Sequence, residues 1–311
     1  MQFRTELTLP KANFLLSHQD EVLSIGSCFA DTIAQKLAFF KFKVTANSFG
    51  TIFNPLSISS LIDMACADEE VNWQTVFVNN QWVSLKVHSS IYAASEDELI
   101  AILDHKQSIF RDKLLNANCL IITLGTAWVY QYLPLQTTVA NCHKIPNTHF
   151  DKILLSVNEI VSSLKCSLEK LRKLNTLLKV ILTVSPVRHL KDTLVLNTVS
   201  KSTLQLAVYE LINAIDNVFY FPAYELLVDD LRDYRFYGND LIHPSEMAEN
   251  YIFEKFCAWC MDKETLEINQ KIEKIQKSLS HRPIQTQGEV YEKHVDNIQK
   301  MIGELPVGVW S

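Results

Sequence analysis

The chain alternates short apolar runs with longer segments whose apolar residues recur at helical spacing. The apolar runs have the length of buried strands and cover residues 22–25, 42–46, 119–124, 179–184 and 218–221. The segments with helical periodicity cover residues 29–40, 55–65, 95–116, 150–174, 197–215, 222–231 and 244–260. Strands and helices that alternate in this way predict an α/β protein with a mostly parallel sheet covered on both faces.

Three further segments do not belong to a minimal sheet of this kind. Residues 76–85 and 128–140 alternate apolar and polar residues around turn signals, which predicts two hairpin insertions. Residues 264–304 are charged, poor in Gly and Pro, and helical in pattern, with a break at residues 281–283. We therefore predict one domain over residues 1–263 and a C-terminal helical appendage over residues 264–311, which is a candidate face for a homo-oligomer.

Composition narrows the class of protein. The chain has 311 residues, of which 48% are apolar, and this is ample for a buried core. The formal net charge of −6 and the lack of a dense Lys/Arg face argue against nucleic acid and against an anionic membrane as partners. No apolar run has the length of a signal-peptide core or a membrane span, so we expect a cytoplasmic protein.

The seven cysteines are odd in number and scattered, which is typical of reduced thiols. Cys257 and Cys260 are the only close pair. They lie inside a predicted helix with no second Cys/His pair nearby, so we interpret them as packing residues rather than a metal or redox site.

The first candidate for chemistry is the turn that follows residues 22–25. Gly26 lets the backbone turn, and Ser27 stands at the start of a helix, where backbone N–H groups can bind an anion. Because open α/β folds bind their ligands at the carboxyl ends of strands, the Ser27 hydroxyl is a candidate nucleophile. The alternative is that Ser27 only caps the helix. The neighbouring thiol of Cys28 is a second candidate, since a helix start can lower the pKa of a thiol, but we favour Ser27.

A second candidate stretch lies near the other end of the domain. Asp240 precedes His243 by three residues, and Pro244 then opens a helical pattern. A carboxylate in this position can hold the imidazole in one tautomer beside a serine hydroxyl. We expect a ring nitrogen of His243 within about 3.5 Å of the Ser27 hydroxyl and Asp240 beside the other nitrogen.

These two stretches carry a family resemblance. The sequence Gly26-Ser27-Cys28-Phe29-Ala30 resembles the signature of the GSCFA family, and with Asp240-x-x-His243-Pro244 it is similar to the first and last blocks of the SGNH (GDSL-like) hydrolases. The resemblance implies a three-layer α/β/α flavodoxin-like fold and hydrolysis of an ester bond. It also implies Ser27 as nucleophile, His243 as base and Asp240 as its orienting partner, with neither a metal nor an organic cofactor.

The resemblance also points to an oxyanion site. It implies that Gly50 donates a backbone N–H, although Gly50 equally suits a simple turn. In the third block of the superfamily an Asn follows Gly125 and Thr126, but this chain has Ala127 there. Thr126, Asn54 or a backbone N–H would then have to replace the missing donor.

Four further side chains follow predicted strands or lie on loops near them. His88 ends the first hairpin and His143 lies on the loop after the second, so both are candidates for substrate contact, and a plain surface position is the alternative. Arg188 and His189 follow residues 179–184 and are candidates to bind a polar or anionic part of a substrate, with structural ion pairing as the alternative.

The resemblance, together with these residues, implies a serine esterase that transfers a small acyl group to water, with a carbohydrate ester among the candidate small-molecule substrates. The chain contains neither of the glycine-rich phosphate-binding loops and no Gly-x-Ser-x-Gly elbow, which argues against a nucleotide-binding protein and an ordinary α/β-hydrolase. The rival hypothesis is a non-catalytic ligand-binding or assembly protein that retains the fold.

Overall fold

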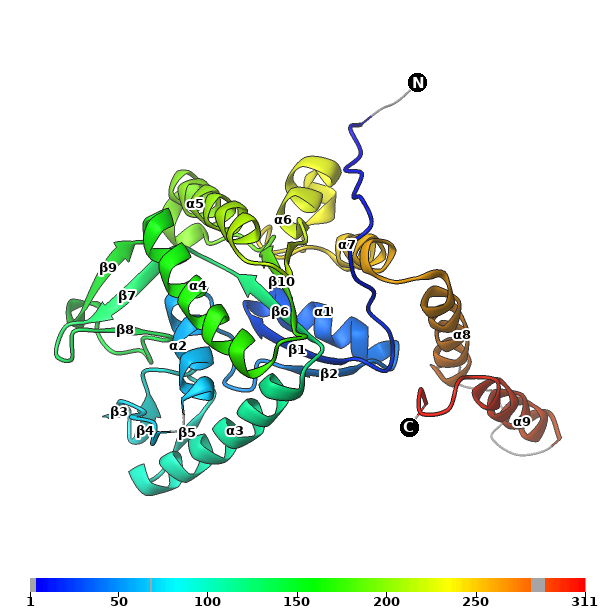
Figure 1. Cartoon of the computed structure of the whole chain (residues 1–311), viewed down its shortest axis with the longest axis horizontal. Coiled ribbons are helices and arrows are strands. Elements are labelled where there is room, and N and C mark those ends of the chain that lie inside the picture. The colour runs from blue at the N-terminus through cyan, green and yellow to red at the C-terminus, as the bar shows by residue number, and fades with distance from the viewer. Residues whose placement is uncertain (1–3, 68, 281–288, 311) are drawn as a thin grey trace.

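The structure is a computed structural model that describes residues 4–67, 69–280 and 289–310. Its centre is a five-stranded parallel sheet (Figure 1). The strands are β1 (Glu21–Gly26), β2 (Lys43–Ala46), β6 (Cys119–Leu124), β10 (Lys179–Val184) and β11 (Val218–Tyr220). Their order across the sheet is β11-β10-β6-β1-β2, so the chain reverses its direction of winding between β1 and β6. This is the flavodoxin-like order, and it confirms the predicted fold class.

Helices cover both faces of the sheet because successive strand residues point to opposite sides. One face of β6 carries Leu120 and Ile122, which pack against α2 (Pro55–Cys66), α3 (Glu96–Asn116), α4 (Val157–Leu174) and α5 (Thr193–Ala214). The other face carries Ile121, which packs against α1 (Cys28–Phe39), α6 (Ala223–Glu225) and α7 (Glu246–Cys260). The buried runs of the sequence therefore became strands with two apolar faces, as predicted.

Both predicted hairpins are present, and each gains a third strand. The first sheet is β3 (Thr75–Val78), β4 (Gln81–Ser84) and β5 (Tyr92–Ala93), and the second is β7 (Trp128–Tyr132), β8 (Thr137–Val139) and β9 (Phe150–Leu154). The helix predicted over residues 150–174 is wrong in its first part, because residues 150–154 pair with β7 instead. The helix begins after Ser156, whose hydroxyl and backbone form a capping box with Glu159.

The C-terminal segment forms two helices, α8 (Lys263–Ser280) and α9 (Glu289–Gly303), with a small apolar core of their own. This core also includes Phe40, and Gln276 Nε2 donates to the Phe39 carbonyl oxygen over 3.2 Å. The segment thus contacts the end of α1. The predicted break at residues 281–283 lies outside the described residues. Within the described residues, no helix is both long and apolar enough to cross a membrane.

Candidate active site

The carboxyl edge of the sheet brings four segments of the chain together. Gly26 at the end of β1 pairs in register with Thr123 of β6, which in turn pairs with Thr183 of β10. The loop after β10 reaches the loop before α7, because the Arg188 N–H donates to the Ile242 carbonyl oxygen over 3.2 Å. The loop that carries Asp240 and His243 is therefore bonded to a segment that leaves the same carboxyl edge as the Ser27 turn, and folds of this topology bind ligands at this edge.

The turn after β1 requires glycine. Gly26 has φ +143°, and a Cβ atom there would lie 2.2 Å from the Thr123 carbonyl oxygen. The backbone N–H of Ser27 donates to this same oxygen over 3.0 Å, so the turn is held against the neighbouring strand. A side chain at position 26 would have to push β1 and β6 apart.

Ser27 is the N-cap residue of α1, but its side chain makes no cap hydrogen bond, so the simple capping role does not describe it. The residue is only 1% exposed, and its hydroxyl oxygen has no hydrogen-bond partner within the described part of the chain. The predicted contact between Ser27 and His243 is therefore not made in this structure. A buried hydroxyl without a partner is uncommon, and functional sites are among the places where it occurs.

Cys28 starts α1 and is only partly buried. Its sulfur is approached by the backbone N–H groups of Cys28 and Phe29, the first amides of the helix. Burial nevertheless raises the pKa of this thiol, and the carboxylate of Asp31 raises it further. The first turn of α1 thus offers N–H donors to a group beside Ser27.

Asp240 and His243 form the predicted pair. Asp240 Oδ2 lies 2.7 Å from Nδ1 of His243, and Asp240 Oδ1 accepts the backbone N–H groups of Ile242 and His243 over 2.9 Å and 3.0 Å. These bonds hold the pKa of Asp240 down, at about 2, with the His243 bond as the largest cause. Both side chains are about half exposed. The carboxylate is thus ionised at neutral pH and fixes one ring nitrogen of His243 as a donor.

Two of the predicted oxyanion donors are engaged elsewhere. The Gly50 N–H donates to the Asn47 carbonyl oxygen over 2.7 Å, and the φ of +76° at Gly50 together with its contact with His88 gives this residue a turn role. The side-chain oxygen of Asn54 accepts the Ser57 N–H and caps α2, and its Nδ2, the group that could donate to an oxyanion, donates to the Val139 carbonyl oxygen over 3.4 Å. Neither group is free to bind an oxyanion in this structure.

Gly125 and Thr126 are also tied to the scaffold. Both backbone N–H groups donate to the Phe53 carbonyl oxygen, over 2.8 Å and 3.1 Å. The Thr126 hydroxyl bonds to the Ser200 hydroxyl over 3.0 Å, and Ser200 also accepts the Ala127 N–H. With Ala127 in place of Asn, these four residues position the strand end rather than present a donor.

His88 and His143 lie on the side of the hairpins. His88 Nδ1 bonds locally to the Ser90 hydroxyl over 3.0 Å. His143 is buried, which lowers the pKa of its ring, and it lines a cavity of about 370 Å³ together with Tyr92 and Lys144. The structure places both residues in the β3–β5 region, among residues other than Ser27 and His243.

Arg188 and His189, by contrast, lie at the sheet edge. The Arg188 guanidinium stacks on Tyr237 at 4.0 Å and on Tyr234 at 5.2 Å, and among the described residues it packs on these aromatic rings rather than in an ion pair. His189 is largely buried and packs edge-on against Phe53. Burial lowers the pKa of His189 to about 4, and the nearby charges of Lys201 and His243 lower it further.

A family model described as the GSCFA family matches residues 21–256. The chain belongs to the GSCFA family. Two solved structures are similar to this GSCFA protein. The family 3 carbohydrate esterase of Clostridium thermocellum has 9% identity and a TM-score of 0.38, with 81% of this chain and 97% of that chain covered. The carbohydrate esterase family 3 protein of Talaromyces cellulolyticus has 12% identity and a TM-score of 0.28, with 54% and 67% covered. No curated protein matches the sequence.

Sequence patterns missed one residue of this GSCFA site, Lys201 on the inner face of α5. It is 1% exposed, and its Nζ donates to the carbonyl oxygens of Gly125 over 2.6 Å and Ser185 over 2.7 Å, which follow β6 and β10. Burial lowers the pKa of Lys201 to about 7, and its charge acts on both Cys28 and His189. The sequence could have pointed to Lys201 through its position in the predicted helix, because residue 201 lies on the same face as the apolar residue Leu204.

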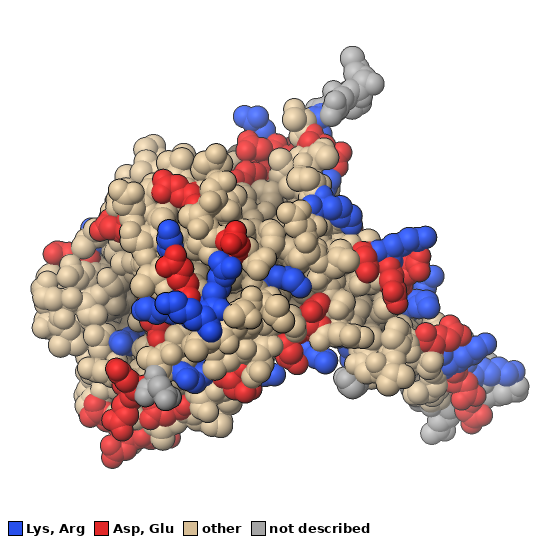
Figure 2. Space-filling model, viewed as in Figure 1, with Lys and Arg blue, Asp and Glu red and all other residues tan. Residues whose placement is uncertain are grey.

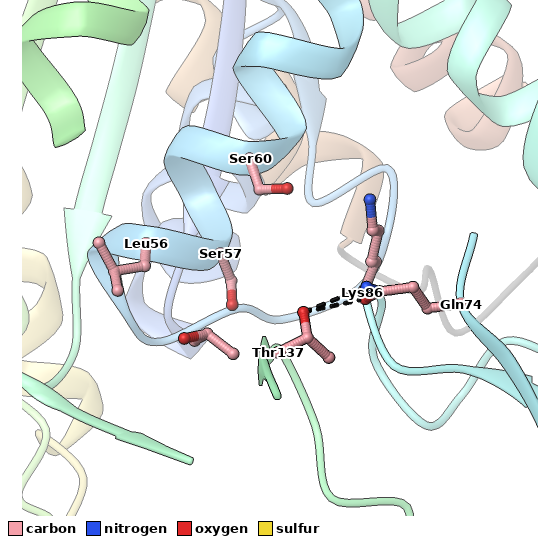
Figure 3. A pocket seen from close by; sticks show the side chains of 7 residues that line it. Leu56, Ser57, Ser60, Gln74, Lys86 and Thr137 are labelled. Carbon is pink, nitrogen blue, oxygen red and sulfur yellow. Dashed lines mark hydrogen bonds between the residues drawn. The ribbon is translucent and has the colours of Figure 1, made fainter. Parts of the chain in front are cut away.

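A separate polar cavity of about 180 Å³ lies between α2, β8 and the loop after β4 (Figure 3). It is lined by Leu56, Ser57, Ser60, Gln74, Lys86, Thr137 and Thr138, with Gln74 and Thr137 hydrogen-bonded across one side. None of the predicted site residues lines it. In the described part of this GSCFA protein, no group of three or more His, Cys, Asp or Glu side chains is placed to share a metal ion.

Proposed function

We propose that this protein is a hydrolase that acts on ester bonds by acyl transfer through Ser27. The observation that carries the proposal is the Asp240–His243 pair, because its 2.7 Å bond orients a half-exposed imidazole at the sheet edge that also holds the Ser27 turn. Membership of the GSCFA family, whose signature contains Ser27, adds support.

The proposed reaction has two steps. The Ser27 hydroxyl proton passes to Nε2 of His243 while Oγ bonds to the acyl carbon, and the alcohol then leaves with that proton. In the second step a water molecule gives its proton to His243, attacks the acyl carbon and releases the acid, and the proton returns to Ser27. The amides of Cys28 and Phe29 at the start of α1 are the proposed oxyanion donors, in place of Gly50 and the missing Asn.

This chemistry requires the Ser27 side chain to rotate toward His243 when a substrate binds, because the hydroxyl is buried and unbonded in this structure. Hydrogen bonds between catalytic groups commonly tighten only when a substrate is bound. The same observation favours the second candidate function, a ligand-binding protein that keeps the fold without catalysing a reaction.

The proposed substrate is a small, uncharged O-acyl ester, with a short acyl group on a carbohydrate-like alcohol. Tyr234 and Tyr237 stand beside Arg188 at the edge of the site, and aromatic faces suit sugar rings as well as apolar chains. Turnover measured on a series of esters of increasing acyl length tests this preference. Activity that rises steadily with acyl length and is absent on acetyl esters would exclude the carbohydrate-ester version.

A fluorophosphonate probe that labels activated serines tests the catalytic proposal. We expect stoichiometric labelling of the wild type, no labelling of Ser27→Ala, and labelling of the matched variant Cys28→Ala. Turnover of an acetyl ester should follow the same pattern. Wild-type protein that resists several such probes would support the ligand-binding alternative. Inactivation by iodoacetamide at Cys28 alone, with turnover retained in Ser27→Ala, would instead make Cys28 the nucleophile.

A further inference from the structure

The outer face of α5 is apolar along nearly its whole length. Val195 is 72% exposed, Leu206 58% and Tyr209 66%. The helix contains only two charged residues, Glu210 on the outside and Lys201, which is buried. Figure 2 shows the contrast, since the surface over α5 carries few charged atoms whereas the adjoining surface over α4 carries many.

The inner face of α5 buries Asn197, Ser200 and Lys201 in its first half and is apolar in its second half, where Leu204, Ala207, Val208 and Leu211 pack into the core under α4. The second half of the helix is therefore apolar on both faces. A helix that is apolar all round normally lies inside a protein, with partners on both sides. In the described chain α5 has such partners on the inner side alone. Its outer face therefore indicates a contact that a single copy does not make.

Five exposed residues of α5 follow a heptad spacing. Val195, Val199, Ser202, Leu206 and Tyr209 are separated by four, three, four and three residues, which places them in one straight seam along the helix. Any face of an α-helix has this spacing, but here four of the five positions are apolar although they face solvent. An apolar stripe of this kind is typical of a helix that packs lengthwise against a second helix.

The apolar area is large enough for a stable contact. With the flanking residues, the exposed apolar side chains are Leu190, Leu194, Val195, Leu196, Val199, Leu206 and Tyr209. Their exposed area adds up to roughly 700 Å², compared with about 300–600 Å² for the largest patch of a typical monomer and about 800 Å² per partner in a standard interface.

We propose that this seam binds the same seam of a second copy of the chain, with the two α5 helices antiparallel about a two-fold axis at Ser202. A two-fold axis there places Val195 opposite the partner's Tyr209, and Val199 within one residue of the level of the partner's Leu206, so a small side chain meets a large one on each side of the axis. The small Ser202 lets the helices approach at their midpoint.

Charge selects the antiparallel arrangement. In a parallel pair the two Glu210 carboxylates would stand side by side across the seam, where like charges repel. In the antiparallel pair they lie at opposite ends, about 24 Å apart from the 1.5 Å rise per residue. A membrane is a poorer occupant, because α5 exposes no Lys or Arg that would attract anionic lipid.

The dimer would also support the site. The inner face of α5 carries Lys201, which bonds to Gly125 and Ser185 at the sheet edge. A partner helix along the outer face would restrict the motion of the element that holds this edge. The proposal itself rests on the α5 surface alone and does not require the esterase activity.

The solution mass of the full chain tests the proposal. By light scattering at micromolar concentrations we expect twice the 35.6 kDa of one chain. Leu206→Glu should be monomeric, with the dissociation constant raised by about 100-fold or more, because it places two carboxylates in the apolar seam. The matched control Leu177→Glu changes a leucine that is 81% exposed outside α5, and it should stay dimeric. Both sites are exposed, so circular dichroism should show folded protein in each case.

Cysteine crosslinking tests the orientation, in a Cys166→Ser background that removes the exposed native thiol. Val195→Cys and Tyr209→Cys should crosslink with a short bismaleimide when the two variants are mixed, and neither should crosslink by itself. A monomeric wild type, whether or not it binds anionic vesicles, overturns the proposal. So does a Leu206→Glu protein that remains dimeric, and crosslinking of Val195→Cys alone would overturn the antiparallel arrangement.

Discussion

Replacing Lys201 by Met should change how the stability of the protein depends on pH. The change keeps the buried stem and removes the amine. In the folded protein burial lowers the pKa of Lys201 from 10.5 to about 7, so between these values the unfolded chain binds a proton that the folded chain does not. The free energy of unfolding must therefore rise with pH across this window and stay level, for this group, below about pH 7.

The magnitude follows from the size of the shift. Each pH unit over which one proton differs between the two states changes the free energy of unfolding by about 1.4 kcal/mol. Because Lys201 is still half protonated near pH 7, the contribution between about pH 7 and about pH 8.5 is about 1.5 kcal/mol. The measurement should stop at about pH 8.5 because of two buried thiols. Burial raises the pKa of Cys119 and Cys257 from 9.0 to about 12, so above about pH 9 the unfolded chain releases protons that the folded chain keeps, and the free energy of unfolding falls again.

Urea unfolding followed by tryptophan fluorescence at several pH values in this window measures the effect. We expect the wild type to gain stability with pH and Lys201→Met to lose most of that gain. Lys173→Met changes an exposed lysine of α4 and should keep the wild-type slope. A wild type whose stability is level between about pH 7 and about pH 8.5, or a slope that survives in Lys201→Met, would refute the reasoning.

Three further predictions concern the site and its turn. Asp240→Asn keeps an oxygen that accepts the backbone N–H groups but removes the negative charge beside His243. The kcat on an acetyl ester should therefore fall by about 100-fold or more with KM nearly unchanged, and an unchanged kcat would contradict the proposed pair. In thermal unfolding scans, Gly26→Ala should lower the melting temperature strongly or prevent folding. The control Gly303→Ala has no atom within 4 Å of its added Cβ and should leave the melting temperature nearly unchanged. The pKa of His189 is about 4 in the folded protein and 6.5 without burial, so the free energy of unfolding of the protein falls as the pH falls through this range. Urea titrations should show that His189→Gln loses up to about 3 kcal/mol less than the wild type over the same range.

The sequence by itself determined the layers and the two motifs. Largely apolar runs such as residues 119–124 and 179–184 are of the kind expected for strands buried on both sides, since they are too short for a buried helix, and the structure has them with the same bounds. The Asp240–His243 contact was also predictable, because three residues on a turn bring the carboxylate back to its own imidazole. Local spacing was enough in both cases.

Other features depended on partners distant in sequence. Residues 150–154 have apolar positions that fit a helix equally well, and only pairing with β7 made them a strand. The backbone amides of Gly50 and Gly125 suited an oxyanion site by position, but hydrogen bonds to Asn47 and Phe53 engage both. The sequence does not encode which acceptor an N–H meets after folding. The predictions of a cytoplasmic location and of a separate unit over residues 264–311 stay predictions.

Which groups of the candidate site are buried was decided by the tertiary structure alone. Burial of the Ser27 hydroxyl and of the Lys201 amine results from the packing of α1 and α5 on the strand ends, and no local pattern fixes it. The outer seam of α5 is a case in which the pattern is visible in the sequence but its exposure is not. Its heptad spacing is visible in the sequence, but only the fold reveals that the residues of the seam remain exposed, because helical periodicity does not say which face the core will cover.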